Sequence, residues 1–167
     1  MASNDPVVSI LEIWPPSTLY AVLTRRVGGS SPAEGQNVWQ FDTTAIWYLD
    51  FLCALRGYVG TTGLTFTLPW TAATATTGTV IWGIAIHRLL GGTDDVDVSH
   101  TYDFNNSSAI TVPGTAGIMT YTDITFTNGA DMDSWADGEL AIVRVRRDTS
   151  DSAAGFAELW GLLGKET

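Results

Sequence analysis

Cysteine and lysine are almost absent from this chain of 167 residues, with Cys53 and Lys165 as the single example of each. One cysteine excludes any disulfide within the chain, so the folded state has to be held by its apolar core. Cys53 lies in the apolar segment IWYLDFLCAL at residues 46–55. Because free cysteine is among the most buried residue types, we expect it to be a core thiol.

Positive charge is also scarce, since eight basic residues face eighteen acidic ones for a formal net charge of −10. Phosphate backbones and anionic lipid surfaces both attract clustered lysine and arginine, so we expect neither nucleic acid nor a membrane as a partner. Two explanations of the acidic excess stay open. It can serve solubility alone, or it can complement a basic patch on a protein partner.

Long hydrophobic runs and catalytic motifs are missing as well. The longest apolar runs are far shorter than a membrane span, and no charged segment precedes an apolar one at the N-terminus, so we expect no signal peptide. There is no G-x-S-x-G and no glycine-rich phosphate loop before a helix. We expect no catalytic residue and no cofactor. A carbohydrate-active enzyme remains a third reading, because paired carboxylates leave no spacing signature.

Metal sites are weakly indicated at most. The turn at residues 94–97 and the loop at residues 131–137 carry alternating aspartates, but both lack the sixth-position glycine and twelfth-position glutamate of a calcium loop. His87 and His100 have no cysteine or further histidine nearby, so zinc is not expected. We interpret the acidic loops as solvated, with Ca²⁺ as the open alternative, and His87 as a surface or interface residue.

What the chain does have is alternation of apolar and polar residues. Val80, Trp82, Ile84 and Ile86 recur with the period of one face of a strand, and residues 64–68 alternate in the same way. About eight to ten such segments follow one another with turn signals at roughly ten-residue spacing. This pattern predicts an all-β antiparallel sandwich or barrel. Residues 155–163 fit either a closing strand or a short helix.

Residues 140–147 predict a strand with two different faces. Ala141, Val143 and Val145 form the expected core face, which leaves Arg144 and Arg146 outward. Two roles for these arginines stay open. They can pair with carboxylates of neighbouring strands, such as Asp123, or clamp acidic residues of an adjacent subunit or capsid protein.

The N-terminal part and the tryptophans suggest contacts with other molecules. The double proline Pro15–Pro16 and the loop at residues 28–35 divide the chain into an extended arm over residues 1–27 and a main domain over residues 36–167. Seven tryptophans exceed what a core of this size needs, and Trp14 and Trp135 lie near element ends. For both, an interface and ordinary packing are equally open.

The order of these segments resembles a family of small jelly-roll virion proteins of tailed bacteriophages. The resemblance covers about residues 38–164, whereas the N-terminal arm does not align. The matching residues are Trp70, Ala72, Gly78, Val80 and Trp82, then Gly114 to Gly117, then Gly138, Arg144, Arg146, Arg147 and Asp148, and finally Ala157, Leu159 and Gly161.

The resemblance implies a single jelly-roll sandwich without enzymatic activity, assembled as trimers or dimers, with a trimer favoured. Its first reading is a capsid cement protein, made in the host bacterial cytoplasm, that binds the major capsid protein on the outer surface of the virion. The alternative is a receptor- or glycan-binding domain of a tail or head-fibre appendage. The interface residues expected for the first reading are Trp14, Pro15, Pro16, Arg25, Arg26, Trp135, Arg144 and Arg146.

Overall fold

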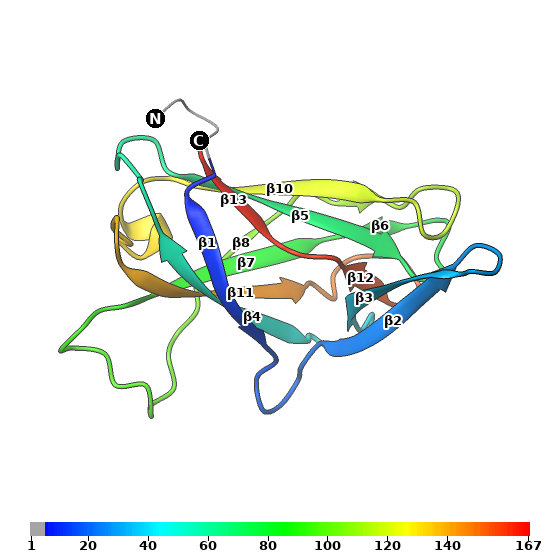
Figure 1. The fold of residues 1–167 in the computed structure, drawn as a ribbon, viewed down its shortest axis with the longest axis horizontal. Helices are drawn as coiled ribbons and strands as arrows, with labels where there is room; N and C mark the ends of the chain where they lie inside the picture. Colours follow the sequence, from blue (N-terminus) through cyan, green and yellow to red (C-terminus); the bar gives the residue numbers. More distant parts are fainter. Residues whose placement is uncertain (1–5) are drawn as a thin grey trace.

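The computed structural model describes residues 6–167, which form two antiparallel sheets packed as layers (Figure 1). The first sheet has the strand order β1 (Val8–Trp14), β4 (Tyr48–Leu55), β11 (Leu140–Arg147), β7 (Trp82–Leu89), β8 (Phe104–Asn106). The second has the order β10 (Thr120–Phe126), β5 (Leu64–Ala72), β12 (Ala157–Leu159), β3 (Glu34–Phe41), β2 (Val22–Gly28), and β13 (Leu163–Glu166) also pairs with β5.

A small third sheet joins β6 (Thr79–Val80) to β9 (Ile110–Thr111), and the 3-10 helix η1 (Ala130–Met132) precedes β11. From β3 to β7, successive long strands lie in alternate sheets, so the chain wraps around the core. The fold is therefore an antiparallel β-sandwich of jelly-roll type, as expected. Over residues 6–167 no helix is long and apolar enough to cross a membrane.

The core contains the faces that alternation predicted. Val80, Trp82, Ile84 and Ile86 are all buried, and so are the three apolar residues of β11 on the same side of their sheet. Trp82 packs edge-on against Phe41 and Trp70 from the opposite sheet, with ring centroids 5.1 and 6.1 Å away. Burial of these rings is the main source of stability, because each removes a large apolar area from water.

Cys53 confirms the expectation of a core thiol. Its side chain is fully buried in β4, and burial raises the pKa of the thiol to about 12. A thiol with so high a pKa stays protonated near neutral pH, so it acts as a small apolar side chain and not as a nucleophile.

The C-terminal residues 155–163, which fitted a strand or a helix, form strand β12 and the beginning of β13. β12 is only three residues long but pairs on both sides, with β3 and with β5. Its place between two long strands explains the extended conformation, because the flanking strands satisfy all of its backbone groups.

The prediction of an extended N-terminal arm is wrong for the described residues. Residues 8–14 form β1, which pairs along its whole length with β4, and residues 22–28 form β2, which pairs with β3. The segment therefore contributes an edge strand to each sheet, and Pro15–Pro16 lie where the chain passes between them. Figure 1 shows β1 beside the C-terminal β13, where Val7 N donates to Gly164 O. Residues 1–5 of the predicted arm lie outside the described part.

Candidate functional site

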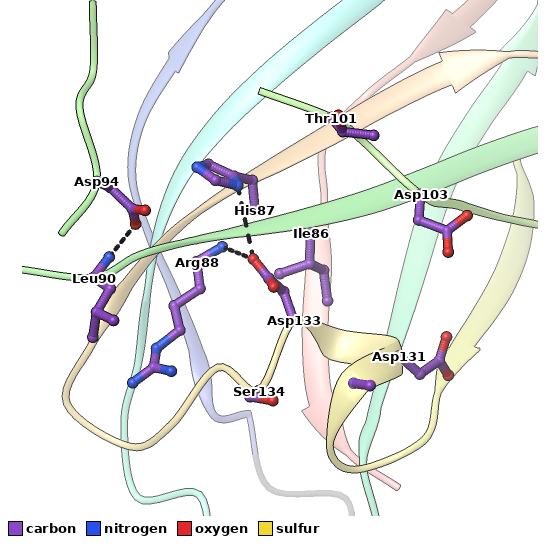
Figure 2. A pocket seen from close by; sticks show the side chains of 11 residues that line it. Ile86, His87, Arg88, Leu90, Asp94, Thr101, Asp103, Asp131, Asp133 and Ser134 are labelled. Carbon is purple, nitrogen blue, oxygen red and sulfur yellow. Dashed lines mark hydrogen bonds and ion pairs between the residues drawn. The ribbon is translucent and has the colours of Figure 1, made fainter. Parts of the chain in front are cut away.

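A cavity of about 410 Å³ opens at one end of the sandwich, where β7 meets η1 and the long connection from β7 to β8. Figure 2 shows side chains from these three segments converging on it. Its lining is dominated by groups that form hydrogen bonds: His87, Arg88, Asp94, Thr101, Asp103, Asp131, Asp133 and Ser134, with Ile86, Leu90 and Ala130 as its apolar part.

Three of the four aspartates are held in place by backbone groups. Asp133 accepts from the Arg88 amide at 2.8 Å, and Asp94 accepts from the amide of Leu90. Asp131 accepts from the Thr127 amide at 2.6 Å and from Asn105 Nδ2 at 2.9 Å. These bonds fix the directions of the carboxylates before any ligand arrives.

The electrostatics of these carboxylates follow from the same contacts. Burial acts to raise the pKa of Asp131, but the hydrogen bonds from Thr127 and Asn105 outweigh it and keep that pKa below its ordinary value. Beside the cavity, Arg88 donates to Glu139 at 2.5 Å, and this bond lowers the pKa of Glu139. Both groups are therefore ionised at neutral pH, and of the two Asp131 lines the cavity.

His87 is the most enclosed polar group of the cavity wall. Its ring stacks on His100 with centroids 3.9 Å apart, and Nδ1 lies 3.7 Å from Asp133 Oδ2. Within residues 6–167, its buried Nε2 has no hydrogen-bond partner. Burial, followed by the nearby His100, lowers the pKa of His87, so the imidazole is neutral near pH 7.

The long β7–β8 connection thus brings together two histidines that the sequence separates. Within residues 6–167, no group of three or more His, Cys, Asp or Glu side chains is placed so that it could hold a metal ion. The two aspartate-rich loops do converge here, so their composition was a usable signal for the position of the cavity. Its other lining residues come from distant segments and share no spacing that a sequence could reveal.

The backbone after η1 is strained where it faces the cavity. Asp133 and Ser134 both have positive φ, at 54° and 53°, which is uncommon for residues with a side chain. Hydrogen bonds from the Ser134 amide to Gly129 O and from the Trp135 amide to Met132 O hold this tight turn. Such strain at a cavity wall is typical of functional sites.

Trp135 packs beneath that turn in the core. The prediction that Trp135 could lie at an interface is therefore corrected. Only 2% of Trp135 is exposed, and its Nε1 donates to Glu139 O at 3.0 Å. The physical reason is the tight turn after η1, which folds the indole under the loop and into the main core.

Arg144 and Arg146 point outward from β11, as expected, but each pairs within the chain. Arg144 donates two bonds of 2.7 Å to Asp50, its cross-strand partner on β4, and its guanidinium stacks on Tyr102 at 3.9 Å. Arg146 donates to Asp148 at 3.2 Å. The suggested partner Asp123 is wrong, since it lies in the other sheet. A role for these arginines toward another subunit stays a prediction.

The remaining predicted interface residues lie around β1 and β2. Pro15 and Arg25 are exposed, Trp14 and Pro16 are half-buried, and Arg26 forms an ion pair with the buried Glu158. They lie on or beside β1 and β2, the edge strands of the two different sheets. Their contact with a partner stays a prediction.

Comparisons with known proteins assign no family. No family model matches the chain, and no curated protein matches it. One similar solved structure is TmCBM61 in complex with β-1,4-galactotriose, with a TM-score of 0.37, 9% identity, and coverage of 93% of this chain and 88% of that chain. Another is TmCBM27, a mannan-recognising carbohydrate-binding module, with a TM-score of 0.36, 12% identity, and coverage of 96% and 99%. At these TM-scores the likeness carries no argument.

Proposed function

We propose that this chain is a non-catalytic glycan-binding domain of a virion appendage, and that the cavity between β7, η1 and the β7–β8 connection is its binding site. The observation that carries the proposal is the group of four aspartates that line the cavity, three of which are held in fixed directions by backbone amides. Carboxylates accept hydrogen bonds from sugar hydroxyls, so a ligand rich in hydroxyl groups satisfies them.

The size and stiffness of the cavity support the same conclusion. Its 410 Å³ falls within the range of about 300–1,000 Å³ that is typical of small-molecule pockets, enough for one or two sugar rings. Asp131 and Asp133 are already oriented by backbone amides, so binding does not have to order them. Preorganisation of this kind improves affinity, because fewer side chains lose freedom on binding.

The proposal includes no catalysis. Ser134 and His87 both border the cavity, but within the described residues no hydrogen bond joins them. A serine without a base that takes its proton is a weak nucleophile. The surroundings of these residues support recognition of a polar ligand and supply no activated group.

The test is a glycan-binding screen with the full chain and two matched variants. Asp103 makes no hydrogen bond within residues 6–167, so Asp103→Asn removes a ligand-facing charge without loosening a loop. Asp97→Asn makes the same change in the same connection but outside the lining. We expect Asp103→Asn to weaken binding about tenfold, which is ~1.4 kcal/mol, and Asp97→Asn to leave it unchanged. Equal binding by all three proteins contradicts the proposed site.

A capsid cement protein is the second candidate, and one observation favours it. Eight of the seventeen exposed large hydrophobic side chains of residues 6–167 lie on β1, β2 and their connection: Ile10, Leu11, Ile13, Leu19, Tyr20, Val22, Leu23 and Val27. Apolar side chains gathered on edge strands are typical of a surface that another protein covers. The partners would be the major capsid protein and further copies of this chain, as a trimer before a dimer.

Copy number separates the two candidates. A cement protein on the outer capsid surface is present in hundreds of copies per particle, whereas an appendage is present in few. A stoichiometric gel of purified particles measures this directly. Hundreds of copies would overturn the appendage proposal, and a handful would overturn the cement proposal.

A further inference from the structure

The β2–β3 hairpin lies at the end of the sandwich opposite η1 (Figure 1). A second cavity, of about 470 Å³, opens against this hairpin. The residues that matter for its chemistry are Arg26, Pro32, Glu34, Gln36, Gly117 and Trp160. We propose that this cavity is a second ligand site, and that it takes a neutral sugar ring stacked on the indole of Trp160. The inference does not require the first cavity to bind a glycan.

A buried carboxylate behind the lining holds Arg26 in place at the second cavity. Glu158 is 3% exposed, and its side chain accepts from Arg26 Nη1, from Thr71 Oγ1 at 2.8 Å and from Gln40 Nε2 at 3.4 Å. A buried charge with three donors is held firmly in one position. The guanidinium of Arg26 is therefore fixed at the cavity wall, while its other N–H groups remain available to a ligand.

The same network orients the aromatic ring. Trp160 is half-buried, and its Nε1 donates to Thr71 Oγ1 at 3.0 Å, while the Thr71 hydroxyl donates to Glu158. The Trp160 amide also donates to Pro69 O at 2.9 Å. The ring and the guanidinium are thus positioned by one set of bonds across β2, β5 and β12.

A glycine leaves the space that the guanidinium occupies. Gly117 has a φ of 83°, and a Cβ at this position would collide with Arg26 Nη2. Any side chain here would therefore strain the backbone and displace the arginine from the cavity wall. The position of Arg26 at the cavity wall therefore requires a glycine at residue 117.

The chemistry of the lining selects the ligand. Trp160 and Pro32 offer apolar surface, and Arg26, Gln36 and Glu34 offer donors and acceptors at its edge. A pyranose has an apolar C–H face and a rim of hydroxyls, so it matches both parts. Because Glu158 neutralises Arg26, Glu34 leaves the site with an excess of negative charge, which disfavours an anionic sugar.

The experiment is calorimetric titration of the full chain with defined probes. The neutral probes are the linear tetrasaccharides of glucose, galactose, mannose and N-acetylglucosamine, and the anionic probe is galacturonic acid tetrasaccharide, each to about 10 mM, a range in which weak single sites are detectable. We expect at least one neutral probe to bind and the anionic probe not to bind. Binding of none of the neutral probes, or of the anionic probe alone, overturns the inference.

Three variants locate the bound sugar. Trp160→Ala removes the stacking surface, and we expect at least tenfold weaker binding. Gln36→Ala changes one exposed side chain of the lining, and we expect a smaller loss of about threefold, ~0.7 kcal/mol. Asn37→Ala is the matched control, because Asn37 is the next residue of β3 and its side chain lies on the opposite face. Binding should then remain unchanged.

The variants also separate the two sites. Binding that survives Trp160→Ala and Gln36→Ala but is lost in Asp103→Asn overturns the second site and supports the first. Binding that is lost in Trp160→Ala and unchanged in Asp103→Asn supports the second and overturns the first. Gln36→Ala, at an exposed position, keeps the test valid if Trp160→Ala fails to fold.

Discussion

The two ends of the sandwich use different kinds of contact to place their polar groups. At the β7 end, Asp94 and Asp131 accept from amides four residues away, so these two carboxylates are held within their own loops, whereas Asp133 accepts from the Arg88 amide of β7. At the β2–β3 end, Arg26 meets Glu158 across 132 residues of sequence, and Trp160 meets Thr71 across 89. The first cavity thus depends on loop structure, whereas the second depends on the packing order of the strands.

This difference predicts unequal costs of mutation. A group held by its own loop can be lost with local effects, because the exposed backbone donor then bonds to water. A group that joins three strands in a buried network leaves unpaired partners behind. Substitutions at the second cavity should therefore lower stability more than substitutions at the first.

The largest expected effect is that of Glu158→Ala. It leaves Arg26 and Thr71 without their acceptor, and we expect a loss of about 2–3 kcal/mol in the free energy of unfolding. The figure stays below that for a fully buried pair, because the Arg26 side chain is 28% exposed. Urea denaturation measures it, with Asp103→Asn as the control expected to change little. Equal stability of the two variants would contradict the proposed difference between the ends.

Gly117→Ala should have the next largest effect. The new methyl meets Arg26 and the backbone keeps a positive φ, so we expect a loss of about 1–2 kcal/mol together with weaker sugar binding at the second cavity. Gly138→Ala is the matched control, since Gly138 also has a φ of 83° and nothing lies within 4 Å of a Cβ there. A Gly117→Ala protein as stable as the Gly138→Ala protein would show that Arg26 is not held as described.

Asp94→Ala should lower the free energy of unfolding less, because the Asp94 carboxylate accepts from an exposed amide of its own loop, that of Leu90. We expect about 0.5–1 kcal/mol of stability to be lost and binding at the first cavity to weaken. Thermal unfolding combined with the glycan screen measures both. Loss of sugar binding at the second cavity in the same variant would be inconsistent with two independent ends.

The smallest expected effect is a pH dependence confined to the first end. The folded-state pKa of His87 lies below its ordinary value of 6.5, because burial and His100 disfavour the charged form. As the pH falls, His87 therefore binds its proton at a higher pH in the unfolded chain than in the folded protein. The stability contributed by neutral His87 is complete above about pH 6.5 and falls as the pH decreases below it. We expect a loss of less than about 1 kcal/mol, absent in His87→Gln. An identical pH profile for both proteins would exclude His87 as the source.

How far the sequence could predict the structure differs from one residue to another. The outward direction of Arg144 and Arg146 was predictable, since alternate residues of a strand face opposite sides. Their partners were not, because the carboxylate opposite Arg144 depends on which strand lies beside β11 and in which register. That strand is β4, which places Asp50 there instead of Asp123.

The candidate sites show the same division. The two aspartate-rich loops were visible in the sequence, but their meeting with His87 required the β7–β8 connection to fold back. From the double proline and the loop at residues 28–35 we predicted an extended arm over residues 1–27. Pairing with β4 and β3 decided the matter for β1 and β2, because the backbone groups on one side of each strand bond to that neighbour.

The sequence by itself determined the all-β class, the core faces of β5, β7 and β11, and the buried thiol of Cys53. These features follow from side-chain type and the two-residue period of a strand, which are local properties. Only the tertiary structure decided the strand order, the partners of the arginines and the position of both cavities. Those features depend on contacts between residues far apart in the chain, which many sequences with the same alternation could arrange differently.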